Sequence, residues 1–223
     1  MFESIKSLDF TPFLISFKLA FITTIILFFL VLPFAWWMSQ TKSKFKPFIE
    51  ALGAMPLVLP PSVLGFYLLV LFSQDSPLGK FLEHFNIELL FSFSGLVVAS
   101  IIYSFPFMLQ PIQSGLESLN KGIIEQSFIA KKSSFTTLFR VALPNIKPSL
   151  LTAIIVTFAH TVGEFGVVLM VGGSIPGQTK VASVAIYEMV EVMDYKAAHI
   201  YSLLMLIISF LVLLSVYIFK TKR

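Results

Sequence analysis

Long apolar blocks without a charged side chain dominate this sequence. Four of them contain no Asp, Glu, Lys or Arg, and they cover residues 19–41, 51–74, 89–116 and 197–219. A fifth block, 148–179, is interrupted only by Glu164. Each block is long enough to cross a bilayer as a helix, which takes about 20 residues, and none shows the period-two alternation of barrel strands. The sequence therefore predicts an all-α, polytopic membrane helical bundle with five transmembrane helices in a single domain, residues 1–223.

The basic residues predict which ends of the spans face the cytoplasm, because cytoplasmic loops retain Lys and Arg. Of the 16 basic residues, 11 fall in segments 42–50, 117–147 and 220–223, namely Lys42, Lys44, Lys46, Lys121, Lys131, Lys132, Arg140, Lys147, Lys220, Lys222 and Arg223. The remaining five accompany most of the acids: Lys6, Lys18, Lys80, Lys180 and Lys196, with Glu3, Asp9, Asp75, Glu83, Glu88, Glu188, Glu191 and Asp194. We expect the N-terminus outside and the C-terminus inside. This asymmetry explains the net charge of +4 better than a nucleic-acid partner does.

The longest inside segment, 117–147, combines apolar residues at helical spacing with a polar centre. Its apolar positions are Ile124, Phe128, Phe135, Leu138, Phe139 and Ala142, and "AKKSS" separates the two halves. Ser133 or Ser134 could cap the second half. This pattern predicts two short amphipathic helices that are joined by a turn and present an apolar ridge to the cytosol. Periodicity leaves a second reading open, in which the helices lie on their own bundle.

Two short motifs lie in this segment: Glu125, Gln126 and Ser127, and further on Val141, Leu143 and Pro144. They resemble the Glu-Ala-Ala signature and the Ile-x-Leu-Pro ending of a cytoplasmic loop in permease subunits of ATP-binding cassette (ABC) importers, with the spacing intact. Lys131 stands where that family has a turn glycine, and a non-Gly residue in a left-handed turn costs about 1 kcal/mol, so a turn of different shape is expected. The resemblance implies a type I importer fold and a loop that docks into an ATPase groove through Glu125, Gln126, Ser127, Phe128, Lys131, Leu138, Val141, Leu143 and Pro144.

Residues 55–69 and 162–191 resemble the oxyanion branch of these permeases. The matching residues are Gly163, Glu164, Phe165 and Gly166, then Ile175, Pro176, Gly177 and Thr179, and the paired Pro60 and Pro61 favour molybdate over sulfate. The resemblance implies an importer of molybdate or tungstate in the bacterial cytoplasmic (inner) membrane, with sulfate or thiosulfate as the alternative. Implied partners are two ATPase subunits, a second copy of this chain and an extracytoplasmic molybdate-binding protein. The chain itself would carry no catalytic site and no cofactor, with ATP and Mg bound by the ATPase.

The prolines and glycines of these stretches predict broken helices whatever the family. Pro56, Pro60 and Pro61 remove backbone donors from the second span, and glycines flank Glu164 in the fourth. Broken spans are tolerated where protein or a water-filled path covers them, and they often mark a transporter's substrate route. An ordinary kink packed against its neighbours is the alternative. The expected pathway or gate consists of Pro60, Pro61, Ser62, His160, Gly163, Glu164, Phe165 and Gly166.

An ionised Glu164 would cost about 2.5–3.5 kcal/mol at the centre of a lipid-exposed helix, so we expect it to face the bundle interior or water. Its expected partners are backbone N–H groups freed by Gly163 and Gly166, or His160 one turn earlier. A buried acid that only satisfies a neighbour is the alternative. The alternative from another functional class is a membrane-embedded metal-dependent enzyme that uses His160 and Glu164, but the chain has no Cys and few other His residues to complete a metal site.

One further stretch, "GGSIPGQT" at 172–179, almost fits a phosphate-binding P-loop. Gln178 occupies the position of the essential Lys, and no buried strand precedes it. We expect a turn-rich external loop rather than a nucleotide site.

Overall fold

The computed structural model describes residues 9–221, so Glu3, Lys6, Lys222 and Arg223 of the charge count lie outside the described residues. The described residues form helices and no strand. The helices are α2 (Thr11–Gln40), α3 (Lys46–Val58), α4 (Pro61–Phe72), α5 (Pro77–Glu83), α6 (Phe93–Glu117), α7 (Lys121–Ile129), α8 (Ser134–Thr137), the π-helix η1 (Leu138–Ala142), α9 (Leu143–Asn145), α10 (Lys147–Val162), α11 (Gly166–Gly172), α12 (Ala182–Glu191) and α13 (Tyr195–Thr221).

The predicted apolar blocks are helical, although two of them are not straight spans. Three helices, α2, α6 and α13, are each long and apolar enough to cross a membrane. The helices α3 and α4 meet at a bend of 109°, and residues 134–145 meet α10 at 84°. Counting each bent pair as one span gives five, the predicted number, but the second pair covers residues 134–162 rather than the predicted block 148–179. The second bend was not predicted, because residues 134–145 were assigned to a short amphipathic helix of the inside segment, separate from the span.

Only two of the three prolines expected to interrupt the second span lie at the break. The helix α3 continues through Pro56 and ends at Val58, and α4 begins at Pro61. Pro60 has an extended ψ of 136° and precedes the first turn of α4, where a missing proline N–H costs nothing. The prediction is thus confirmed for Pro60 and Pro61 and is wrong for Pro56.

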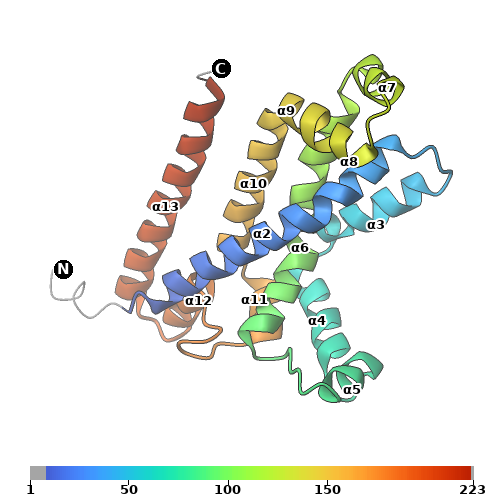
Figure 1. Ribbon diagram of the computed structural model, residues 1–223. Helices are drawn as coiled ribbons and strands as arrows, with labels where there is room; N and C mark the ends of the chain where they lie inside the picture. The colour runs from blue at the N-terminus through green and yellow to red at the C-terminus, as the bar shows by residue number, and fades with distance from the viewer. Residues whose placement is uncertain (1–8, 222–223) are drawn as a thin grey trace.

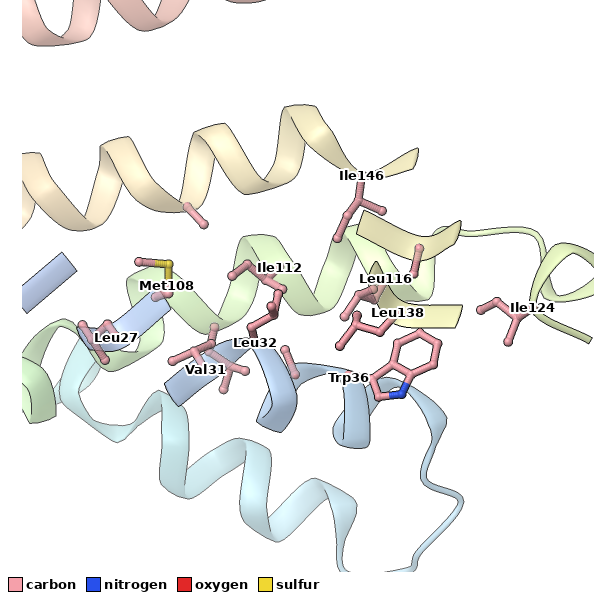
Figure 2. Packing of buried hydrophobic residues seen from close by; sticks show 14 residues of the cluster. Leu27, Val31, Leu32, Trp36, Met108, Ile112, Leu116, Ile124, Leu138 and Ile146 are labelled. Atoms are coloured by element: carbon pink, nitrogen blue, oxygen red, sulfur yellow. The ribbon is translucent and has the colours of Figure 1, made fainter. Parts of the chain in front are cut away.

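The main hydrophobic core lies between α2, α6 and α10 and extends into the segment that joins α6 to α10 (Figure 2). Side chains of α2 and α6 form most of it, and Ile124 of α7, Leu138 of η1 and Ile146 at the start of α10 close one end. Residues 117–147 are therefore fixed to the bundle by buried apolar contacts, since burial of such side chains is the main stabilising contribution.

The two ends of the bundle differ in what they carry. Figure 1 shows α7, α8 and α9 at one end, together with the turn between α2 and α3 and the last turns of α13. The helices α5, α11 and α12 lie toward the other end. The predicted inside segments 42–50 and 117–147 consequently share one end of the molecule. The outer faces of α13 expose large apolar side chains, as a helix in contact with a lipid bilayer would: Leu203, Leu206, Ile207, Phe210 and Leu211.

Candidate functional site

The helical structure of the Glu164-bearing block is interrupted at Glu164, between α10 and α11. The helix α10 ends at Val162, Gly163 follows with φ −88° and ψ 0°, and α11 begins at Gly166. The N–H of Gly163 donates to the carbonyls of Ala159 and His160, at 3.3 and 3.1 Å. The break predicted from the flanking glycines is confirmed, and it leaves the Gly163 N–H satisfied by the helix that it terminates.

The carboxylate of Glu164 turns into the bundle, where it is held by hydroxyl groups of α6. Ser100 Oγ donates to Oε2 at 2.5 Å and Ser104 Oγ donates to Oε1 at 2.8 Å. Ser104 also shares a hydrogen bond of 2.8 Å with Thr161 Oγ1. Glu164 is 3% exposed, and the three hydroxyl residues are buried as well. An interior position was predicted correctly, because an acid in a span must find polar partners inside the protein.

The prediction of hydrogen-bond partners for the Glu164 carboxylate, either backbone N–H groups at the break or His160, is wrong. The carboxylate accepts hydrogen bonds from side chains of α6, and no hydrogen bond or ion pair joins it to His160 among the described residues. The physical reason is the packing of α6 against α10, which brings Ser100 and Ser104 within reach of the break. These two serines, spaced four residues apart on one helix face, were missed. Their spacing inside a charge-free block was the available signal.

A second contact anchors the main chain at the break. Ser183 of α12 donates its hydroxyl to the carbonyl oxygen of Glu164. Glu164 therefore connects α6, through its side chain, with α12, through its backbone.

A cavity of about 540 Å³ opens beside the break. It is lined by Pro61, Ser62, Tyr103, Ala159, His160, Gly163, Glu164, Phe165 and Gly166. Every residue of the expected pathway except Pro60 is on this wall, and Pro60 directly precedes it as the N-cap of α4. Two stretches about a hundred residues apart in the sequence thus meet around one cavity. Their role as a pathway stays a prediction.

The helices α4 and α11 approach each other through glycines. A Cβ atom added to Gly166 would lie 2.9 Å from Cβ of Pro61, and one added to Gly65 would lie 2.9 Å from Cβ of Met170. Small residues at a helix crossing allow backbones to come close inside a membrane. The broken second span and the broken fourth span are therefore packed directly on each other next to the cavity.

His160 lies among aromatic rings. Its ring stacks on Phe107 at 3.8 Å between centroids and lies 4.8 Å from Tyr103, and its Nε2 atom is buried without a hydrogen-bond partner in the described part of the chain. Residues 9–221 contain no group of three or more His, Cys, Asp or Glu that could hold a metal ion. The geometry therefore gives the metal-dependent alternative no ligand set.

The loop at 172–179 is rich in turns, as expected. Gly173 and Gly177 have φ of 61° and 75°, which favours glycine. Thr179 is fully buried and donates its hydroxyl to the carbonyl of Gly172 at 2.6 Å. This threonine, which would bind a metal ion in a P-loop, closes the turn instead.

The segment 117–147, which we call the coupling segment, begins with α7. The N–H groups of Lys131 and Lys132 donate to the carbonyls of Phe128 and Ser127, at 2.9 and 3.1 Å. Lys131 has φ 55°, so α7 ends in a complete Schellman motif with lysine at the left-handed position. The expectation of a differently shaped turn is wrong, because the chain accepts the cost of a left-handed lysine, about 1 kcal/mol.

The second half of the coupling segment is shorter and more irregular than one amphipathic helix. Ser133 caps α8 by accepting from the N–H of Thr136 at 3.2 Å, whereas Ser134 accepts from Nε1 of Trp36 at 2.8 Å. The chain then widens into η1 and continues into α9, with Pro144 near its start. The two-helix prediction is correct for α7, and the second helix is divided into three pieces.

The predicted apolar ridge is split between the core and the surface. Ile124, Leu138 and Ala142 are 6%, 5% and 0% exposed and belong to the main core. Five other large apolar side chains of the segment are exposed. Ile123 is 40% exposed at the start of α7, and the other four form what we call the coupling face: Phe128 (44%), Ile129 (80%), Phe135 (71%) and Phe139 (44%). Leu138 was predicted to contact a partner, and this is wrong because it packs inside the bundle (Figure 2).

The other predicted coupling residues also differ in exposure. Ser127 is buried and bonds to Thr137 Oγ1 at 2.8 Å, which ties α7 to α8. Val141 and Leu143 are partly buried. The remainder are exposed: Glu125, Gln126, Lys131 and Pro144.

Comparison with known protein families identifies the family of this chain. A model of the family described as "Binding-protein-dependent transport system inner membrane component" matches residues 20–222. The chain belongs to this family. The all-α membrane bundle predicted from the apolar blocks, and the ABC importer permease fold implied by the resemblance, are thereby confirmed, as is the assignment to a transport subunit rather than an enzyme.

Individual relatives are similar over most of their length. The chain is 43% identical to the molybdenum transport system permease protein ModB of Azotobacter vinelandii, over 94% of this chain and 93% of that protein. It is 33% identical to the putative molybdenum transport system permease protein YvgM of Bacillus subtilis, over 92% and 90%. It is also 33% identical to the probable sulfate transport system permease protein cysT of Prototheca wickerhamii, over 80% and 70%.

Solved structures support the fold. A bacterial ABC transporter involved in the import of the acidic polysaccharide alginate matches with a TM-score of 0.81 at 13% identity, over 99% of this chain and 82% of that chain. A bacterial alginate ABC transporter in complex with an alginate pentasaccharide-bound periplasmic protein matches with a TM-score of 0.76 at 14% identity, over 96% and 80%. At these identities the likeness concerns the fold alone.

Proposed function

We propose that the chain is the membrane permease subunit of an ATP-driven importer that carries molybdate or tungstate. The observation that carries this proposal is the 43% identity to a molybdenum permease along nearly the whole of both chains. The geometry agrees with it, because Pro61 and residues 163–166, which are shared with the oxyanion branch, line one cavity at two helix breaks. Discontinuous spans of this kind commonly line a transport route.

A sulfate permease is the second candidate, because several sulfate permeases are about one-third identical to this chain. Measurements of uptake distinguish a molybdate permease from a sulfate permease. In cells that carry the complete transporter, radiolabelled molybdate uptake should be inhibited by excess tungstate and only weakly by sulfate at the same concentration. Equal inhibition by sulfate would assign the transporter to sulfate instead.

The proposed assembly contains two copies of this chain, two ATPase subunits and an extracytoplasmic binding protein for the oxyanion. The coupling face supports an ATPase contact, since its four large apolar side chains are exposed on a segment that Ile124, Leu138 and Ala142 fix to the core. ATP and Mg would bind to the ATPase, and this chain would bind no cofactor.

The proposed orientation in the bacterial inner membrane has the N-terminus outside and the coupling segment and C-terminus in the cytoplasm. It is supported by the basic residues and by the shared end of the basic segments (Figure 1). A reporter that is active only outside the cytoplasm should work when fused after Gly79 or Val192 and be silent after Lys44 or Lys132. The reverse pattern would contradict the orientation and the cytoplasmic ATPase contact with it.

A further inference from the structure

The coupling segment connects α6 with α10, and these two helices pack against each other inside the bundle. The helix α6 leads into it and α10 leads out of it, and the two pack side by side (Figure 1). At the far end of α10 the chain breaks, so a displacement carried along α10 reaches α11 only through the three residues of the break or through side-chain contacts across it.

Four buried polar side chains link the break to α6, and we call them the carboxylate clasp: Ser100, Ser104, Thr161 and Glu164. They are 0%, 0%, 2% and 3% exposed. Three hydrogen bonds of 2.5 to 2.8 Å connect them. Because these groups are buried, separating α6 from the break would leave hydroxyl and carboxylate groups unpaired, which is unfavourable. The clasp therefore opposes separation of α6 from the break.

The clasp also reaches the wall of the cavity. Glu164, Gly163 and Phe165 line it directly, and Gly166 fixes the start of α11 against Pro61 of α4. The Glu164 carboxylate itself is turned toward α6. A direct contact between this carboxylate and an oxyanion is disfavoured, since like charges repel and its two oxygens already accept from the serines.

We propose that Glu164, Ser100 and Ser104 are positioning residues that transmit movement of the coupling segment, through α6, to the helix break and the cavity wall. This role rests on the proposed function, because it requires an ATPase that moves the coupling segment. Without the hydrogen bonds of the carboxylate clasp, the ATPase would continue to hydrolyse ATP, but the cavity wall would respond weakly. Fewer oxyanions would then be moved for each ATP consumed.

The test measures uptake and ATP hydrolysis in the same vesicles, which contain the complete transporter and its loaded binding protein. Glu164→Ala should lower molybdate uptake per ATP by about tenfold, within the usual range of coupling between sites, while the rate of hydrolysis stays near that of the wild type. Glu164→Gln should retain most of the ratio, because its amide oxygen still accepts a hydrogen bond and serine can accept from its NH₂ group. Ser94→Ala is the matched control, since Ser94 lies on α6 but is exposed.

If Glu164→Ala does not accumulate in the membrane, the single variants Ser100→Ala and Ser104→Ala provide the test. Each should lower the ratio, and combining the two should lower it by a factor different from the product of the single effects, because both serines donate to the same carboxylate. An unchanged ratio in all three, or uptake and hydrolysis falling in parallel, would overturn the positioning role. Loss of the ratio in Glu164→Gln as well as Glu164→Ala would show that charge rather than hydrogen bonding matters, which also overturns it. If sulfate proved to be the substrate, the proposed specificity would fail, and the ratio would be measured with sulfate.

Discussion

Phe128→Asp is expected to leave the permease in the membrane and to remove its ATPase subunit. Phe128 is 44% exposed and lies on the coupling face with Ile129, Phe135 and Phe139. The ring centroids of Phe135 and Phe139 are 4.4 Å apart, with the ring planes tilted by 39°. A buried aromatic at a protein contact often contributes 2 kcal/mol or more, which corresponds to roughly 30-fold in affinity. A carboxylate in its place would add a desolvation penalty. The amount of ATPase that co-purifies with a tagged permease measures the effect.

Leu138→Asp should behave differently, although Leu138 belongs to the same predicted ridge. Leu138 is 5% exposed and packs in the core that includes Trp36 and Leu116. Removing a buried leucine costs about 2–5 kcal/mol before any buried charge is counted. The permease itself should therefore disappear from the membrane fraction. Normal amounts of permease that lack only the ATPase would contradict this core position.

Phe81→Asp provides the matched control for the coupling face. Phe81 is 60% exposed but lies on α5, at the opposite end of the bundle (Figure 1). This variant should keep its ATPase. If Phe128→Asp also kept its ATPase and transported normally, the coupling face would not be the docking surface.

The split of the ridge shows where a sequence pattern stops being informative. Ile124 and Phe128 are one helical turn apart and share a face, so periodicity gives them the same environment. In the structure Ile124 is buried and belongs to the main core, whereas Phe128 is half exposed, because only one side of α7 takes part in that core. Which side is covered depends on how the coupling segment packs on the bundle, and helical spacing within residues 117–147 carries no information about it.

The spans were predictable because a charge-free block is a local property of the chain. The bends of 109° and 84° were not, since their angles are set by packing between helices. Prolines located the first break only in part, because Pro56 is accommodated inside α3.

Glu164 illustrates the same division between local and long-range information. Its interior position follows from the cost of a carboxylate in lipid. Its partners on α6 follow from the register in which α6 packs on α10, which residues near Glu164 do not determine. The family motif and the two prolines identified most of the residues that line the cavity, but not Tyr103. The spacing of Ser100 and Ser104 shows that they share a face of α6, whereas their pairing with Glu164 could be assigned only from the packed helices.

The two glycines that flank Glu164 are equivalent in the motif and different in the structure, so the same substitution should give opposite results. A Cβ at Gly166 would lie 2.9 Å from Cβ of Pro61, a distance that real Cβ atoms essentially never show, and 3.4 Å from the backbone of Pro61 and Ser62. A Cβ at Gly163 would meet nothing closer than the His160 carbonyl at 3.6 Å, and its φ of −88° suits any residue.

Gly166→Ala is therefore expected to abolish most of the uptake while Gly163→Ala preserves it. The proline ring and the backbone at the start of α4 cannot yield as a flexible side chain would, so α4 and α11 must separate next to the cavity. Overpacking of this kind costs about 1–3 kcal/mol, or roughly 5- to 150-fold in an equilibrium. Initial uptake rates in vesicles with equal amounts of assembled transporter measure it. Equal activity of the two variants would mean that the close contact of α4 and α11 is not needed for transport; activity lost only in Gly163→Ala would place the critical contact on the other side of Glu164.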